Sequence, residues 1–224
     1  SEEIENVITR LSVLGKWRLS VRGLQQEYSV SKRSIEHSLK RLEFNGLLAH
    51  RKGGQWIIHQ LDEARLDSLY DIRFWLEPNL LQNAVVHIPM DVIKQTLDAH
   101  EDALARLPHV SGAELNDLEI TLHRTLLEYA NNQAGMAALS SVNAGLVMSK
   151  HILASDEIPV GSQDPFIDEH IAVLGAVKRR RSEESKVRMQ AHLMKSREKV
   201  ISRLRRFRAA SPARTFEFAT RIKD

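Results

Sequence analysis

Residues 24–57 read LQQEYSVSKRSIEHSLKRLEFNGLLAHRKGGQWI. The order of helix-starting, apolar and helix-ending residues in this stretch predicts the fold of the first part of the chain. Ser31 is a favoured helix N-cap, because its hydroxyl can accept a hydrogen bond from a free amide in the first turn. Gly46 suits the left-handed position that ends a helix. Between them runs one apolar stripe, formed by Ile35, Leu39 and Leu42. The stretch therefore predicts a helix over 31–45.

The flanking segments complete a recognisable unit. Helices are expected near 3–14 and 20–28, and "SVS" makes the turn before the third helix. After Gly46, "LLAH" and "QWIIH" read as two strands around the glycine-containing turn "RKGG". Three helices followed by a hairpin predict a winged helix-turn-helix over residues 1–60.

The outer face of this unit suits double-stranded DNA. In a helix-turn-helix the second helix enters the major groove, where Lys and Arg reach guanine and Ser hydroxyls serve phosphates. Residues 1–60 hold ten Lys and Arg against six Asp and Glu, a net +4 within a chain total of +3. Such a face can also be merely solvated, but its combination with the turn and the basic hairpin favours DNA. The candidate contacts are Ser31, Lys32, Arg33, Ser34, His37, Lys40, Arg51, Lys52 and Gly53.

The same stretch resembles the DNA-binding segment of the GntR-family transcriptional regulators. The matching residues are Leu24, Val30, Ser31, Ile35, Leu39, Leu42, Gly46 and Leu47. Lys32 replaces the family's usual Arg, Ser34 its Pro, and Glu36 its second Arg. The resemblance implies a regulator that reads an operator. A carboxylate at 36 removes one expected contact and adds repulsion from DNA.

Composition sets limits on the class of protein. Of the 224 residues, 42% are hydrophobic and 27% charged, and there is no cysteine, which excludes disulfides and thiolate metal sites. No apolar run reaches 18 residues, so no membrane span is expected. The opening "SEEIENVITR" lacks the basic-then-apolar order of a secretory signal. We expect a cytoplasmic protein.

From residue 61 onward the periodicity is helical throughout. Helices are expected near 63–86, 90–106, 113–130, 134–154, 165–180 and 183–208. Short joins between them predict an antiparallel all-α bundle over 61–210. The fold class is therefore mainly α. Residues 211–224 form a tail, which is read as an extension or an arm.

Polar side chains interrupt the apolar faces of three of these helices. In "LEITLHRTLL" (118–127) Glu119 and His123 stand four apart among leucines, and His170 and His192 lie on later apolar faces. A histidine buried alone is usually a hydrogen-bonded core residue. A buried carboxylate, however, is normally paired or bound to a cation. Three inward histidines with a carboxylate favour a divalent metal in the bundle.

The second part resembles the FCD domain, the all-helical ligand-binding domain of the FadR subfamily of GntR regulators. Many members carry Asp-x-x-x-His on one helix and one His on each of two later helices, together holding a metal. Here Glu119 and His123 match the first pair, with Glu for Asp, and His170 and His192 match the later elements. The resemblance implies a bound metal, and imidazole nitrogen with carboxylate oxygen suits Zn²⁺ or Ni²⁺, with Mn²⁺ or Fe²⁺ as alternatives.

"LYDIRFWLEPNLLQNAV" (69–85) matches the first helix of that domain, with Arg73 and Glu77 at its usual Arg and Glu. Arg73 either pairs with Glu77 one turn away or offers its donors to a small carboxylate effector bound at the metal. A two-fold operator needs two copies, so a homodimer is expected.

Two alternatives to a metal-containing, effector-binding regulator remain. A metal-dependent enzyme could use the same residues, but no second carboxylate or nucleophile is evident beside them, and a winged helix would serve no purpose in it. We therefore expect no enzymatic activity. A regulator with a purely structural metal, or with none, is the other alternative.

Overall fold

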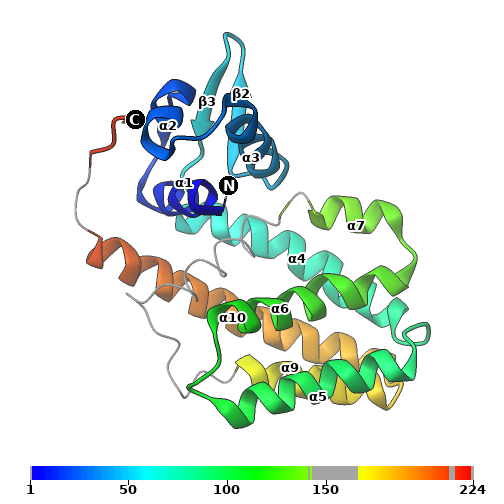
Figure 1. The fold of residues 1–224 in the computed structure, drawn as a ribbon. Coiled ribbons are helices and arrows are strands. Elements are labelled where there is room, and N and C mark those ends of the chain that lie inside the picture. The colour runs from blue at the N-terminus through cyan, green and yellow to red at the C-terminus, as the bar shows by residue number, and fades with distance from the viewer. Residues whose placement is uncertain (1, 141, 143–165, 212–214, 223–224) are drawn as a thin grey trace.

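The computed structural model describes residues 2–140, 142, 166–211 and 215–222. A small winged-helix part lies across one end of a larger helical bundle (Figure 1). The predicted fold class, mainly α with an N-terminal winged helix-turn-helix and an all-α bundle, is confirmed.

The winged-helix part consists of α1 (Glu2–Leu14), α2 (Val21–Tyr28), α3 (Lys32–Phe44), β2 (Leu48–Arg51) and β3 (Gln55–Ile58). The side chain of Ser31 accepts a hydrogen bond from the Ser34 amide at 3.2 Å, so the predicted cap of α3 is confirmed. Gly46 has a φ of 74°, the left-handed value expected where that helix ends. The predicted apolar stripe, Ile35, Leu39 and Leu42, is buried in one core.

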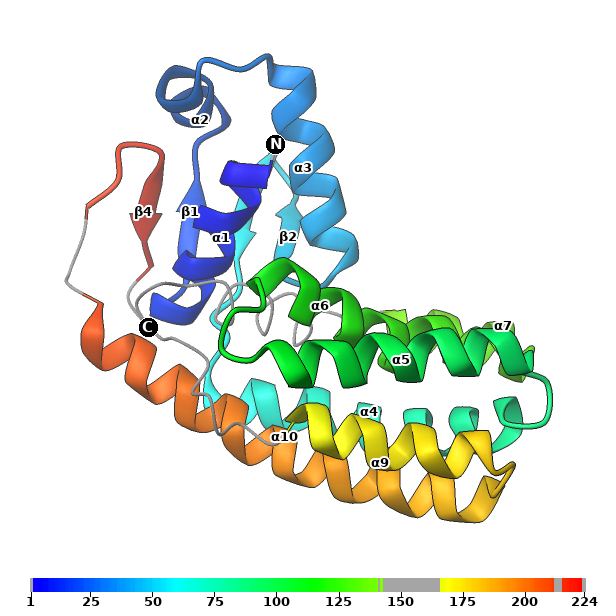
Figure 2. The same ribbon diagram turned by 60° about the horizontal axis from the view of Figure 1, so that its bottom comes forward.

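Two strands extend the hairpin into a four-stranded antiparallel sheet. Strand β1 (Trp17–Leu19) was not predicted, and β4 (Ala219–Arg221) comes from the C-terminal tail. The strand order is β2-β3-β1-β4, and β1 pairs with both β3 and β4. Figure 2 shows β4 beside β1 at the edge of the sheet. The tail therefore does not stand apart as an arm, because its strand belongs to the winged-helix sheet.

The bundle contains α4 (Glu63–Ala84), α5 (Met90–Arg106), α6 (Gly112–Ile120), α7 (Gln133–Ser140), α9 (Phe166–Lys178) and α10 (Ser182–Ala210). Helix α10 packs along α4 and α9, and α5 packs against α9 (Figure 2). The bounds of α4, α5, α9 and α10 agree with the predicted helices to within two residues at each end. The helix expected over 134–154 begins as α7, and its residues 141 and 143–154 lie outside the described residues.

The segment predicted as one helix over 113–130 changes its winding. After α6, residues Thr121–Thr125 form a π-helical turn (η1), and Leu126–Ala130 form a 3₁₀ turn (η2). A π turn inserts an extra residue, changes which way the following side chains face, and is frequent at functional sites. His123 lies in this turn and is buried.

The two parts meet at the C-terminal end of α10. The Arg208 guanidinium donates hydrogen bonds to the carbonyl oxygens of Val13, at 2.8 Å, and Leu61, at 3.1 Å. The same helix carries His192 near its middle. Helix α10 therefore connects the candidate site to the winged-helix part. Among the described residues, no helix has both the length and the apolar character that crossing a membrane requires.

Candidate metal centre

Three histidines from separate helical segments meet inside the bundle. His123 comes from η1, His170 from α9 and His192 from α10, and all three are buried. The Nε2 atom of His192 lies 3.1 Å from Nε2 of His123 and 3.2 Å from Nε2 of His170. One nitrogen of each ring lies within 4.8 Å of the other two. The structure thus brings together the three imidazoles that the sequence singled out.

Glu119, the fourth predicted ligand, faces the same point. Its Oε2 lies 3.5 Å from Nε2 of His123, and its Oε1 lies 3.5 Å from Nε2 of His170. The side chain is 13% exposed, which leaves it between the cluster and the solvent side. Carboxylate oxygen and imidazole nitrogen are a donor set that Zn²⁺, Ni²⁺, Mn²⁺ and Fe²⁺ all accept.

The outer nitrogen of each ring also has a partner. Nδ1 of His123 lies 2.5 Å from a carboxylate oxygen of Glu77, and Nδ1 of His192 lies 2.9 Å from one of Glu169. An ionised carboxylate only accepts hydrogen bonds, so each of these Nδ1 atoms carries the proton. When the rings are neutral, both Nε2 atoms are then bare and can bind a metal. Metal-binding histidines commonly have such outer partners.

Electrostatics favours a cation among these nitrogens. Bare nitrogens that face each other at 3.1–3.2 Å repel unless a proton or a metal lies between them. Burial lowers the pKa of His192, and burial together with the neighbouring histidines lowers the pKa of His170 well below 6.5. A proton is therefore disfavoured there at neutral pH. The residues present fit a divalent metal.

Arg73, the predicted effector contact, is 2% exposed on α4. Its Nε donates to Glu77 at 2.6 Å, so the ion pair considered from the sequence is present. Its Nη2 is buried and has no hydrogen-bond partner among the described residues. Burial alone would raise the pKa of Glu77, but the Arg73 guanidinium and His123 outweigh burial and lower it to about 2. Arg73 is therefore paired with Glu77 and still has one unused buried donor.

Sequence reasoning missed His100 and Glu169. His100 lies in α5 on the buried face formed by Ile93, Thr96, Leu97 and Ala103. The periodicity test that identified the other histidines would have found it. Glu169 has no comparable local signal, since it contacts a histidine 23 residues away on the next helix.

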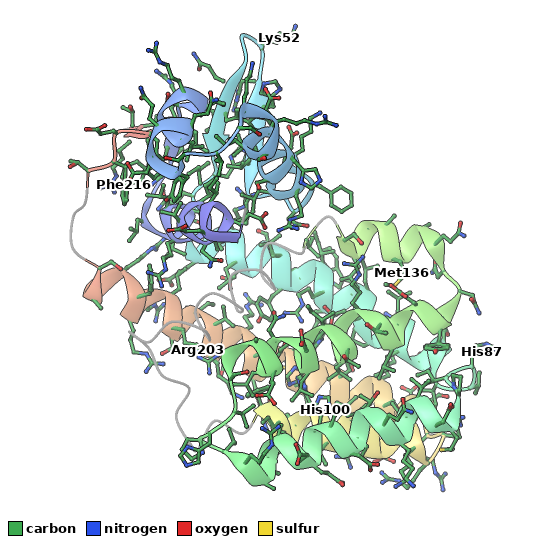
Figure 3. The ribbon with its side chains drawn as sticks, viewed as in Figure 1. Lys52, His87, His100, Met136, Arg203 and Phe216 are labelled. Atoms are coloured by element: carbon green, nitrogen blue, oxygen red, sulfur yellow. The ribbon has the colours of Figure 1, made fainter. Side chains whose placement is uncertain are left out.

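The predicted DNA contacts lie far from this cluster, in the winged-helix part. All of them are exposed: Ser31, Lys32, Arg33, Ser34, His37 and Lys40 around α3, and Arg51, Lys52 and Gly53 in the wing. Lys52 lies at the tip of the hairpin, directed away from the bundle (Figure 3). Within α3, Lys32 pairs with Glu36 at 3.6 Å, so one of the predicted cations is partly neutralised.

Comparison with known proteins identifies the family of this chain. The family model of the FCD domain matches residues 68–195, more than half of the chain. The chain belongs to the FCD family of GntR transcriptional regulators. As an FCD regulator it carries an effector-binding domain behind its winged helix, and a family of regulators argues against the enzyme considered from the sequence.

Solved structures share the fold of this FCD regulator. McbR/YncC of Escherichia coli is 15% identical, with a TM-score of 0.64 over 90% of this chain and 96% of that one. A GntR protein from Rhodococcus is 14% identical, with a TM-score of 0.61 over 90% and 95%. A GntR family member from Pseudomonas syringae is 19% identical, with a TM-score of 0.51 over 84% and 78%. No curated protein matches the sequence.

Proposed function

We propose that this FCD regulator binds a divalent metal through His123, His170, His192 and Glu119. The observation that carries the proposal is the convergence of three buried Nε2 atoms: that of His192 lies 3.1 Å from that of His123 and 3.2 Å from that of His170. The rings of His123 and His192 are also held from outside by carboxylates. Zn²⁺ and Ni²⁺ suit this donor set best, with Mn²⁺ or Fe²⁺ as alternatives.

The metal would serve to bind an effector, a small organic acid. A bound divalent ion supplies a Lewis-acidic position that accepts a carboxylate oxygen. The unused Nη2 of Arg73 is a buried, charged donor, and such a donor is stabilised by an anionic partner. The effector class we infer is therefore a small carboxylate.

Effector binding would change the affinity for a double-stranded DNA operator. The contacts we assign to DNA are the exposed residues of α3 and the wing, namely Ser31, Lys32, Arg33, Ser34, His37, Lys40, Arg51, Lys52 and Gly53. Helix α10 carries His192, and near its C-terminal end Arg208 donates hydrogen bonds to the carbonyl oxygens of Val13 and Leu61. This connection supports coupling between the bundle and the winged-helix part. An effector shifts operator affinity only by binding one arrangement of these parts more tightly than another. We infer that the protein is a homodimer, because a two-fold operator is bound by two DNA-binding domains. We also infer that it acts in the cytoplasm.

Metal binding is tested on the purified full chain. We expect stripping and reloading with Zn²⁺, Ni²⁺ or Mn²⁺ to restore one bound ion per chain and to raise Tm, because a ligand of the folded state stabilises it. His192→Ala should abolish both effects, whereas His37→Ala, at an exposed position on α3, should change neither. A wild-type chain that takes up none of these metals would contradict the proposal.

The effector is tested separately. A library of small carboxylic acids is screened by thermal shift on the metal-loaded chain and on the stripped chain. We expect active acids to stabilise only the loaded form and then to change binding to a DNA duplex selected by the protein itself. Equal stabilisation of both forms would place the acid elsewhere in the molecule.

A further inference from the structure

His100 lies next to the histidine cluster without being one of its predicted ligands. It is fully buried on α5, which packs against α9, and Figure 3 labels it within the bundle. Its Nε2 lies 3.1 Å from Nδ1 of His170, and the two ring centroids are 5.3 Å apart. His100 therefore contacts His170 at the nitrogen that points away from the cluster.

A backbone carbonyl determines where His100 carries its proton. Its Nδ1 lies 2.7 Å from the carbonyl oxygen of Thr96, one turn earlier on α5. A carbonyl oxygen only accepts hydrogen bonds, so Nδ1 must be the protonated nitrogen. His100 is fully buried, and its two ring nitrogens face a backbone carbonyl and another imidazole rather than a carboxylate, so the ring is favoured in the neutral form with a single proton. Nε2 of His100 is therefore a bare acceptor.

This acceptor in turn determines the tautomer of His170. A proton on Nδ1 of His170 can be donated to Nε2 of His100 over 3.1 Å. The opposite tautomer would place two bare, buried nitrogens at that distance, which is unfavourable. The proton therefore stays on Nδ1, and Nε2 of His170 is left bare toward His123 and His192.

We propose that His100 is a positioning residue that holds His170 in the Nδ1–H tautomer, so that all three cluster histidines present Nε2 to one cation. For His123 and His192 the carboxylates of Glu77 and Glu169 serve this purpose. A neutral imidazole does the same without adding a negative charge to a site that already has Glu119. The effect on metal binding rests on the proposed function, whereas the tautomer does not.

Two variants separate the acceptor from the space it fills. His100→Gln retains an oxygen acceptor near the position of Nε2, and His100→Leu removes the acceptor while keeping an apolar side chain of moderate size. Zn²⁺ affinity is measured by competition with a chelator, and the Co²⁺ absorption spectrum reports the ligand field. We expect His100→Leu to weaken affinity about 10- to 100-fold and to alter the spectrum. His100→Gln should stay near wild type in both.

The tautomer is read independently in the metal-free protein from ¹⁵N chemical shifts of the histidine rings, with His170→Gln to assign the signals. We expect Nδ1–H at His170 in the wild type and in His100→Gln, and a mixture of tautomers in His100→Leu. A wild-type His170 protonated on Nε2, or unchanged metal affinity in a folded His100→Leu, would overturn the inference. If the wild type binds no metal, the proposed function fails, while this spectrum still decides the tautomer. The wild-type spectrum also decides it if His100→Leu does not fold.

Discussion

The carboxylate of Glu77 joins Arg73 to His123: one oxygen accepts from Nε of Arg73 at 2.6 Å, and the other lies 2.5 Å from Nδ1 of His123. All three side chains are almost completely buried. A single carboxylate therefore balances the charge of the candidate effector contact and orients a candidate metal ligand. A substitution at position 77 should therefore affect both Arg73 and His123.

Glu77→Gln should destabilise the fold and weaken metal binding together. Removing one partner of a buried ion pair leaves the other charge uncompensated, at a cost of about 3–5 kcal/mol in the free energy of unfolding. Glutamine has one acceptor oxygen for two donors, so its NH2 group must face either Arg73 or Nδ1 of His123, and the uncharged side chain no longer supports the ring as the carboxylate does. Metal affinity should therefore fall about 10- to 100-fold. Urea unfolding and chelator competition measure the two effects. Glu128→Gln, at an exposed position, serves as the control, and a Glu77→Gln protein as stable as this control would contradict the assignment.

Metal-free protein should lose stability in mild acid. Burial lowers the pKa of His100, His170 and His192 in the folded chain, while unfolding returns them toward 6.5. Below that value the unfolded chain binds more protons, so the stabilisation is complete above about pH 6.5 and is lost as the pH falls. Urea midpoints should therefore decrease between about pH 7.5 and 5.5. A flat profile over this window would show that these rings are not buried in the neutral form.

The wing should contribute to DNA binding through charge alone. Lys52 is exposed at the hairpin tip, where a phosphate contact is the simplest use of an ammonium group (Figure 3). Lys52→Ala should weaken binding to all duplexes alike and reduce the slope of log K against log salt by about 1. Fluorescence anisotropy over a salt series measures the slope. Lys94 is exposed on α5 in the bundle, so Lys94→Ala should leave the salt slope unchanged. Equal slopes for both variants would show that the wing does not contact DNA.

Removing the negative charge of Glu36 should have the opposite effect on DNA affinity. Glu36 pairs with Lys32 on α3 and places a negative charge on the face predicted to meet DNA. Glu36→Gln should therefore tighten DNA binding and make it more dependent on salt, because Lys32 becomes free to contact phosphate. The same anisotropy series provides the measurement, with Glu128→Gln as the control. Weaker binding would mean that Glu36 contacts a base itself.

The tail segment that leads into β4 should stabilise the winged-helix part. Phe218 is 2% exposed, and its ring lies 5.9 Å from that of Tyr28 and 5.4 Å from that of Phe216. Phe218→Ala should cost about 3–5 kcal/mol, as large-to-small changes in a core do. Glu217→Ala, at the exposed neighbouring position, is the control. Tm and urea unfolding provide the readout, and a cost no larger than the control's would mean that β4 is not docked in solution.

Gly23 offers a second test of the same contact. A Cβ atom at this position would lie 2.7 Å from Cα of Phe218 and 2.9 Å from its Cβ. Because backbone must move to relieve such a contact, Gly23→Ala should displace the strand and destabilise the protein, although alanine by itself favours a helix. Combining it with Phe218→Ala should cost less than the sum of the two single changes, which a double-mutant cycle measures.

Helix α3 shows why part of the fold was predictable. Its cap at Ser31, its apolar stripe and the glycine that follows it all lie within 16 residues, and each acts through local geometry. Strand β1 shows the opposite case. Three residues, WRL, carry no usable periodicity, and they form a strand because β3 and β4 pair with them from distant parts of the chain.

From the sequence alone one could determine which side chains turn inward, because helical periodicity is a property of neighbouring residues. That was enough to select His123, His170 and His192, and to place Glu119 beside the first of them. Tertiary structure decided the rest: the π turn that carries His123, the nitrogen that each ring presents, and the partners Glu77, His100 and Glu169 behind the rings. These depend on how helices distant in sequence pack, and a hydrogen bond of about 3 Å requires their positions to be correct within a fraction of an ångström.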